Sequence, residues 1–189
     1  MNNKITLLIS AIVVVILIIA AVIAYNYLKD KTDPLTDQQT PSDTLNNSTK
    51  DRVADFTVMD NNGNMVNLSD FFGQPIVLNF WASWCPPCKD EMPAFNKIYG
   101  EYKDNVAFLM VDLTDGQRET TEDGKAYVSK QGYTFPVYFD TKKEGSKAYT
   151  INSIPQTYFI DKDGTLVKSF LGGINEKTIR QYVELISQN

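Results

Sequence analysis

Two cysteines lie three positions apart where a predicted strand ends and a predicted helix begins. Residues 76–80 form an apolar run typical of a buried strand, and the residues after Cys88 carry apolar side chains at helical spacing. The first N–H groups of a helix have no partner within it, and its dipole is positive there, so a thiolate is favoured over a thiol. Cys85 and Cys88 therefore predict a redox pair that attacks and resolves disulfides.

The rest of the composition narrows the chemistry of this pair. The 189-residue chain contains no histidine and no third cysteine, so a zinc site would lack two ligands. As a structural staple the bridge would close only a four-residue loop, which stabilises by about 2 kcal/mol. Redox exchange is therefore favoured over a metal-binding or structural role. We expect no metal and no cofactor besides the redox-active Cys85–Cys88 disulfide. The formal net charge of −5 argues against a nucleic-acid partner.

The order of predicted elements indicates an α/β fold with a mixed central sheet and helices on both faces. In chain order we expect a β-hairpin over 55–67, a strand over 76–82, the helix after the cysteines and a strand over 106–112. We then expect a helix over 120–131, a strand over 135–139, a helical turn over 144–149, a hairpin over 156–171 and a helix from about residue 175.

The N-terminal segment predicts a membrane anchor. Residues 5–24 are apolar or small and carry no charge, and 20 helical residues are long enough to span a bilayer. We expect a transmembrane signal-anchor over 1–28, a flexible polar linker over 29–51, and a globular domain over 52–189. A cleaved signal peptide is the alternative, since Val22-Ile-Ala24 is a tolerable cleavage site. An anchored thiol pair is best placed on the extracytoplasmic side of the cell membrane, with a single membrane pass.

The stretch Trp81–Pro93, W-A-S-W-C-P-P-C-K-D-E-M-P, resembles the thioredoxin superfamily and within it the TlpA/ResA-like membrane-anchored thiol–disulfide oxidoreductases, of AhpC/TSA-redoxin type. The resemblance runs from about Arg52 to the end of the chain. It implies a thioredoxin fold with an added N-terminal β-hairpin and a central insertion over 120–139. It also implies disulfide-bearing clients, such as apocytochrome c in cytochrome c biogenesis or envelope proteins, and a membrane thiol-electron donor. We expect a monomer.

The two cysteines are assigned different roles by position. Cys85 is nearer the helix tip and solvent, so we expect it to attack a client disulfide, and Cys88 to resolve the mixed disulfide. Pro86 and Pro87 lack the N–H groups that would best stabilise a Cys85 thiolate. We therefore expect the pKa of Cys85 to be lowered only modestly, as suits a reductant more than an oxidant.

Glu91 follows Cys88 by three residues and shares its helix face. If buried, its pKa rises and it could exchange a proton with Cys88; from the residues alone, a solvated helix glutamate is the favoured reading. The resemblance implies a functional glutamate at this place. Thioredoxins carry a buried aspartate on the preceding strand instead, and Asn79 stands at that position here.

The client-binding residues are expected around the cysteines and at Ile154–Pro155. From the residues alone, Pro155 is read as a strand-start proline. The resemblance implies a cis peptide there, packed against the cysteines, with the Ile154 backbone pairing with the client chain. We also expect Trp84, Pro86 and Pro87 to shape the rim around Cys85, and Trp81 to lie in the core.

Three other functions stay open at this point. A disulfide oxidant of the same fold differs only in reduction potential. A thiol-based metal-delivery protein would use the same two cysteines, although the chain has no histidine. A thiol peroxidase would need a single reactive cysteine in a different loop context, which W-C-P-P-C does not match.

Overall fold

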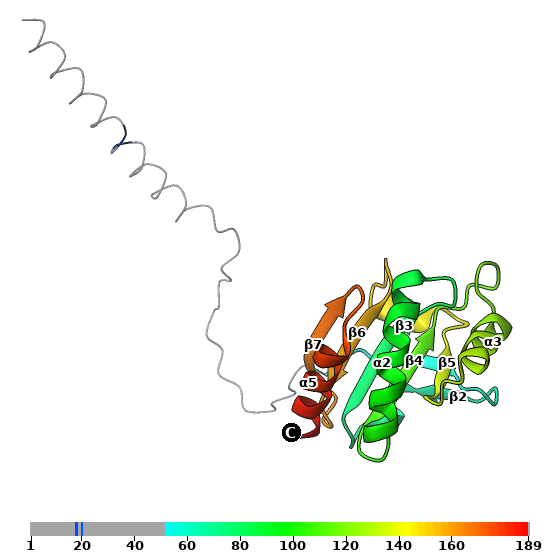
Figure 1. Cartoon of the computed structure of the whole chain (residues 1–189), viewed down its shortest axis with the longest axis horizontal. Helices are drawn as coiled ribbons and strands as arrows, with labels where there is room; N and C mark the ends of the chain where they lie inside the picture. Colours follow the sequence, from blue (N-terminus) through cyan, green and yellow to red (C-terminus); the bar gives the residue numbers. More distant parts are fainter. Residues whose placement is uncertain (1–17, 19, 21–51, 189) are drawn as a thin grey trace, which may run out of the picture. The chain divides into compact units, whose positions relative to one another are not determined.

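The computed structural model describes Ile18, Ala20 and residues 52–188 (Figure 1). The chain divides into two units, Met1–Asn47 and Ser48–Asn189, and the strands and helices of residues 52–188 all belong to the second. Apart from Ile18 and Ala20, the predicted anchor over 1–28 and linker over 29–51 lie outside the described residues. Within the described part of the chain, no helix is long and apolar enough to cross a membrane.

Residues 52–188 form a seven-stranded sheet with the order β2-β1-β5-β4-β3-β6-β7. The strands are β1 (Thr57–Met59), β2 (Met65–Asn67), β3 (Ile76–Trp81), β4 (Ala107–Asp112), β5 (Val137–Phe139), β6 (Gln156–Ile160) and β7 (Leu166–Leu171). The three central strands β3, β4 and β5 are parallel, and the strands on either side pair antiparallel. The predicted mixed sheet and both predicted hairpins are confirmed.

Helices cover both faces of the sheet, as predicted. The helices α2 (Pro86–Tyr102), α3 (Thr121–Gln131) and α5 (Glu176–Ser187) pack on one face (Figure 1). The short helix α4 (Glu144–Ala148) and the 3-10 helix η1 (Leu68–Phe71) cover the other. Each face has its own apolar core. The α3 and β5 elements occupy the predicted central insertion.

The strand β3 is buried along its whole length, which explains why its sequence does not alternate. Val77 and Trp81 belong to the core under α2, whereas Leu78 and Phe80 belong to the core on the opposite face. The prediction that Trp81 lies in the core is confirmed, because its side chain is fully buried. Asn79 is the polar exception in this strand, and it is also fully buried.

Local sequence signals fix the helix ends close to their predicted positions. The Thr120 side chain accepts a hydrogen bond from the Asp123 N–H at the start of α3, and Gly132 ends that helix in the left-handed conformation. Asn175 caps α5 in the same way through the Thr178 N–H. The strand β5 is shorter than predicted, because Pro136 immediately before it has no N–H to donate to a neighbouring strand.

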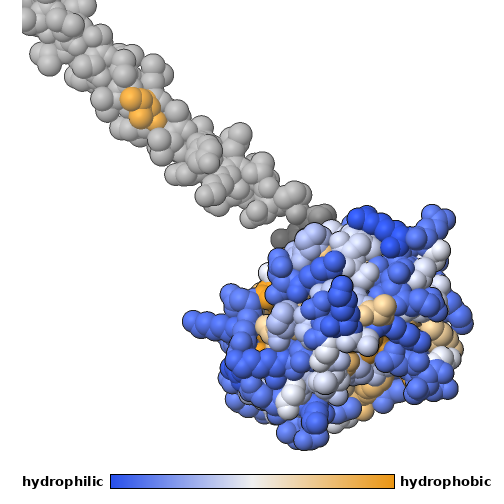
Figure 2. Space-filling view, turned by 45° about the vertical axis from the view of Figure 1, so that its right-hand side comes forward, coloured by the Kyte–Doolittle hydropathy of each residue, from blue (hydrophilic) through white to orange (hydrophobic). Residues whose placement is uncertain are grey.

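Residues on the described surface are mainly hydrophilic in the view of Figure 2, with apolar residues scattered between them. Leu171 at the end of β7 is a prominent exception, with 70% of its surface exposed. It pairs with Gln156 at the start of β6.

Candidate active site

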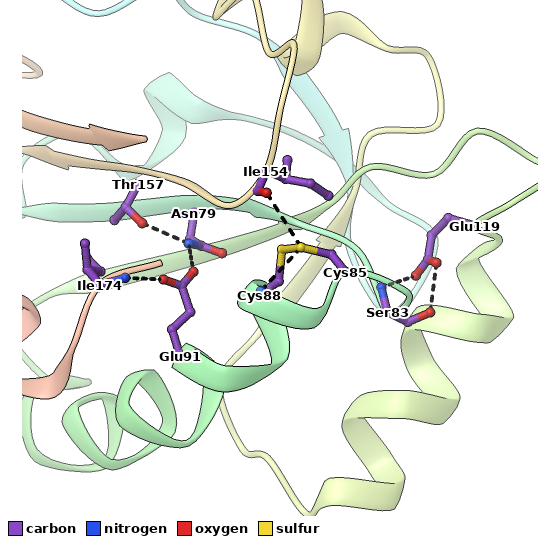
Figure 3. The surroundings of a disulfide bond; sticks show 9 residues. All are labelled: Asn79, Ser83, Cys85, Cys88, Glu91, Glu119, Ile154, Thr157 and Ile174. Atoms are coloured by element: carbon purple, nitrogen blue, oxygen red, sulfur yellow. Dashed lines mark hydrogen bonds between the residues drawn. A yellow bond between two sulfur atoms is a disulfide. The ribbon is translucent and has the colours of Figure 1, made fainter. Parts of the chain in front are cut away.

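The two cysteines form a disulfide at the start of α2 (Figure 3), with an S–S distance of 2.06 Å. Cys85 is the N-cap residue of α2, and its sulfur accepts a hydrogen bond from the Cys88 N–H at 3.3 Å. Pro86 and Pro87 occupy the first two helical positions and are exposed. Because neither proline has an N–H, Cys88 supplies the first backbone donor of the helix to Cys85.

The disulfide is almost enclosed by the protein. Cys85 is 2% exposed and Cys88 is fully buried. Both sulfur-bearing residues belong to the core under α2. The difference in access between them is small in this oxidised state, but it has the predicted direction.

The loop before β6 brings a second backbone segment to the sulfur of Cys85. The Ile154–Pro155 peptide bond is cis, as the resemblance implied. The Ile154 carbonyl oxygen lies 3.7 Å from Cys85 Sγ, and Pro155 is buried (Figure 3). The fold therefore brings together Ile154, Pro155 and the cysteines, which are about 70 residues apart in sequence.

Glu91 is buried rather than solvated, so the reading of a solvated helix glutamate is wrong. Its side chain is only 3% exposed. Oε1 accepts a hydrogen bond from Asn79 Nδ2, and Oε2 accepts one from the Ile174 N–H, both at 2.9 Å (Figure 3). Burial raises the pKa of Glu91 to about 7, and these two hydrogen bonds oppose the shift without cancelling it.

Asn79 connects Glu91 to the strand β6. Its side-chain nitrogen also donates to Thr157 Oγ1 at 2.9 Å. Thr157 is fully buried and lies two residues after the cis proline. The Asn79 side chain therefore links the Glu91 carboxylate on α2 to Thr157 on β6.

A cavity of about 480 Å³ lies beside Glu91. It is lined by Pro87, Asp90, Glu91, Gly173, Ile174 and Asn175. Among the described residues, no group of three or more cysteine, aspartate or glutamate side chains is placed to hold a metal ion.

The turn before Cys85 is held by a residue that the sequence analysis missed. Glu119 is fully buried, and its two carboxylate oxygens accept hydrogen bonds from the backbone N–H and the hydroxyl of Ser83, both at 2.8 Å (Figure 3). Its partner lies 36 residues away in sequence. No periodicity or motif connects these two positions, so this contact could not be predicted from the sequence.

A second buried acid lies close to Glu119. Asp112 ends β4 and is fully buried, and neither of its carboxylate oxygens meets a hydrogen-bond donor among the described residues. Burial, with the negative charge of Glu119 adding to it, raises the pKa of Asp112 to about 9. The helix α3 passes so close that a side chain at Gly124 would overlap Asp112 Oδ2. The sequence analysis did not single out Asp112; an acid at the end of an otherwise apolar strand is the signal that could have found it.

The loop that carries Glu119 also covers Trp84. Trp84 is half-buried, and the Arg118 guanidinium stacks on its ring with Cζ 3.4 Å from the centroid. The Asp115 carboxylate accepts hydrogen bonds from the N–H groups of residues 117, 118 and 119, which closes the loop on itself. The 115–119 loop therefore contacts both residues that precede Cys85.

Comparison with known proteins places these features in context. The family model described as AhpC/TSA family matches residues 49–169, a segment that includes both cysteines, Glu91 and Pro155. The chain is 32% identical to thiol-disulfide oxidoreductase ResA of Halalkalibacterium halodurans over 72% of this chain and 76% of the relative. It is 34% identical to the thioredoxin-like protein YneN of Bacillus subtilis, over 71% of this chain and 78% of the relative.

Solved structures agree with the sequence relatives. StoA from Bacillus subtilis superposes with a TM-score of 0.60 at 28% identity, covering 68% of this chain and 96% of StoA. A thiol:disulfide interchange protein DsbE from Chlorobium tepidum gives a TM-score of 0.65 at 27% identity, covering 73% of this chain and 96% of that protein. The thioredoxin-like fold expected from the resemblance is thereby confirmed.

Proposed function

The chain belongs to the AhpC/TSA family and is a ResA-like thiol–disulfide oxidoreductase, and we propose that it works as a reductant of client proteins outside the cytoplasm. The observation that carries this proposal is the position of the Cys85–Cys88 disulfide. It lies at a helix start that offers Cys85 one backbone donor, beside half-buried Ile154 and one helical turn from a buried glutamate.

The reaction begins from the reduced dithiol. The Cys85 thiolate attacks one sulfur of the client disulfide, and the other client sulfur leaves as a thiolate. The Cys88 thiolate then attacks Cys85 Sγ, which breaks the mixed disulfide and releases the second client thiolate. Two electrons pass from the dithiol to the client, the client thiolates take up protons, and the protein is left with the Cys85–Cys88 disulfide. A dithiol donor restores the reduced state by the same exchange in reverse.

Glu91 is the proposed acceptor of the Cys88 proton. It lies one helical turn after Cys88, and its pKa of about 7 keeps the carboxylate and the acid both populated near neutral pH. Asn79 and Ile174 hold both carboxylate oxygens in place. A group with these properties accepts a proton when Cys88 becomes nucleophilic and returns it when the disulfide is reduced again.

The preference for reduction follows from the prolines. A thiol–disulfide protein is a strong oxidant when its reduced form, with a thiolate at the helix start, is strongly stabilised. Pro87 has no N–H at the second helical position, from which a backbone donor would reach Cys85, so this stabilisation is small. Reduced Cys85 is therefore expected to be a comparatively basic and strongly reducing thiol.

The client is proposed to bind as an extended strand across the disulfide. Ile154 presents its backbone 3.7 Å from Cys85 Sγ, as an added strand requires. Exposed Pro86 and Pro87 and half-buried Trp84 form the surface around the sulfur. The clients are proposed to be apocytochrome c or other envelope proteins.

The location is proposed from the sequence. The apolar run over 5–24 would anchor the protein in the cell membrane, the polar segment over 29–51 would connect it to the extracytoplasmic domain, and a membrane thiol donor would supply electrons. We propose that the protein acts as a monomer.

Two measurements test the proposal. Equilibrating the full-length protein in detergent with a dithiothreitol series gives the reduction potential, and we expect a value well below about −200 mV. A value near about −120 mV would instead identify an oxidant. Independently, Cys88→Ser should accumulate a mixed disulfide with a client, whereas Cys85→Ser should trap none. A metal titration that saturates the reduced protein at micromolar levels would favour metal delivery instead.

A further inference from the structure

The disulfide has positively charged residues on the side that faces α3. Arg118 lies on the ring of Trp84, the residue directly before Cys85. Lys89 directly follows Cys88, and its Nζ lies 5.3 Å from the centroid of the Tyr127 ring on α3. Both side chains are exposed. Lys89 and Arg118 together are called the cationic rim below.

Among the residues that the structure describes, neither cation of the cationic rim is in an ion pair. The ion pairs in this part of the chain involve Lys97 and Arg180 instead. The Asp115 carboxylate is in the same loop as Arg118, but it accepts three N–H groups of that loop. Two aromatic rings, rather than carboxylates, hold the rim cations in place.

Stacking leaves Arg118 ready to bind a carboxylate. A guanidinium that lies flat on an indole keeps its N–H donors in the plane of the group, where they match the two oxygens of a carboxylate. The loop beneath Arg118 is closed by Asp115 and is tied to Ser83 through Glu119. The cation is therefore held on the ring of Trp84, the residue before Cys85, by a loop that is hydrogen-bonded to Ser83.

We propose that the cationic rim selects client segments that carry an aspartate or glutamate next to the reactive cysteine. This inference rests on the proposed function, because it concerns the strand that binds across Cys85. Ile154 supplies the backbone of that site from the β6 side, and the rim supplies charge from the α3 side. The acidic side chain of the client meets Arg118 when its cysteine reaches Cys85.

The net charge of the chain predicts the opposite preference, for basic over acidic client segments, so the two explanations can be told apart by experiment. A protein of net charge −5 repels acidic peptides at long range. If the whole-molecule field decided the rate, acidic peptides would react slowest and salt would speed them up. If the cationic rim decides it, acidic peptides react fastest and salt slows them down.

The test uses the full-length reduced protein in a neutral detergent and three disulfide peptides. The peptides are identical except for one residue beside the attacked cysteine, which is Glu, Gln or Lys. At low salt we expect the rates to fall in that order, by about twofold to fivefold per step, as for exposed ion pairs. Raising the salt should bring the three rates together.

Variants of the cationic rim show whether it causes the preference for the Glu peptide. Arg118→Gln and Lys89→Gln should each shrink the ratio of the Glu-peptide rate to the Gln-peptide rate. Arg118→Lys keeps the charge but not the planar pair of donors, so it should keep only part of the preference. Lys103→Gln makes the same charge change at the far end of α2 and should change nothing.

The outcomes are distinct. Equal rates for the three peptides, or the Lys peptide reacting fastest, would overturn the cationic rim while leaving the exchange reaction established. A preference that survives both Gln variants would also overturn it. If the protein reduced none of the peptides, the proposed function itself would fail.

Discussion

Asn79 and Glu91, one on the central strand and one on the helix that follows it, are joined by a 2.9 Å hydrogen bond inside the core. The bond fixes an acid with a pKa near 7 one helical turn from Cys88. A neutral amide on the strand therefore orients the titrating group on the helix. Substitutions at Asn79 and at Glu91 should therefore have different effects: the first changes the orientation of the carboxylate, and the second removes the titrating group.

Glu91→Gln should remove a pH-dependent step at some cost in stability, because its amide oxygen replaces only one of the two acceptors that Asn79 and Ile174 contact. The carboxylate accepts the Cys88 proton only when ionised, so the rate at which Cys88 resolves a mixed disulfide should rise as the pH increases through about 7. The variant should lose this rise and react about tenfold to a hundredfold more slowly above pH 7. Stopped-flow fluorescence across pH 5–9, about two units either side of that pKa, measures it.

The control for this experiment is Glu184→Gln, an exposed carboxylate on α5. It should keep the wild-type profile. An unchanged profile in Glu91→Gln would mean that another group accepts the proton.

Pro87→Ala should make the protein more oxidising. The change restores an N–H at the second helical position, from which backbone groups reach the N-cap side chain, here the sulfur of Cys85. The added donor stabilises the thiolate, so the pKa of Cys85 should fall and the reduction potential should become less negative, by on the order of 30 mV. Thiolate absorbance and equilibration with glutathione report the two quantities.

Pro86→Ala is the matched control for that change. Its N–H would sit at the first helical position, which does not normally reach the cap. We expect a clearly smaller effect. Equal shifts in the two variants would refute the argument from donor position.

Asp112→Asn should stabilise the protein at neutral and alkaline pH. The pKa of Asp112 is raised to about 9 in the folded protein from an ordinary value of 3.8, so the folded state holds a proton that the unfolded state releases between these values. Stability is therefore lost as the pH rises from about 4 towards 9.

The isosteric amide removes this loss, so the free energy of unfolding should increase by on the order of 5 kcal/mol at pH 8 and change little near pH 4. Urea denaturation at the two pH values measures the difference. A variant less stable than wild type at pH 8 would show that the ionised acid is needed.

Glu119→Ala should loosen the turn that presents Cys85. It leaves the half-buried Ser83 N–H and hydroxyl without their charged acceptor, at a cost of about 1–3 kcal/mol in the free energy of unfolding. Glu119→Gln keeps one acceptor and gains one donor, so it should retain most of the stability. The alkylation rate of reduced Cys85 should change in the alanine variant and stay close to wild type in the glutamine variant.

The fold could be predicted from the sequence because the strongest signals for its strands, helices and turns lie within a few neighbouring residues. The uninterrupted apolar run of β3, the Thr120 cap of α3 and the turn at Asp163-Gly164 each act within a few residues. The cis peptide at Pro155 followed only from the resemblance, since a proline at a strand start has an ordinary explanation.

The contacts that were missed join distant positions. The burial of Glu91 depends on Ile174, 83 residues further along the chain, and the turn before Cys85 depends on Glu119. A single sequence contains no periodicity that connects such pairs. Their roles became visible only when the sheet brought the loops at its edge together.

The close approach of Gly124 to Asp112 has a consequence for how this protein can diverge. A side chain at 124 would occupy the space of the acid, so the two positions cannot change independently. A descendant that replaces the glycine must first shorten or lose Asp112, whereas one that loses the acid leaves room for a larger residue at 124. Mutational drift at the end of β4 is therefore expected to proceed as an ordered pair of steps.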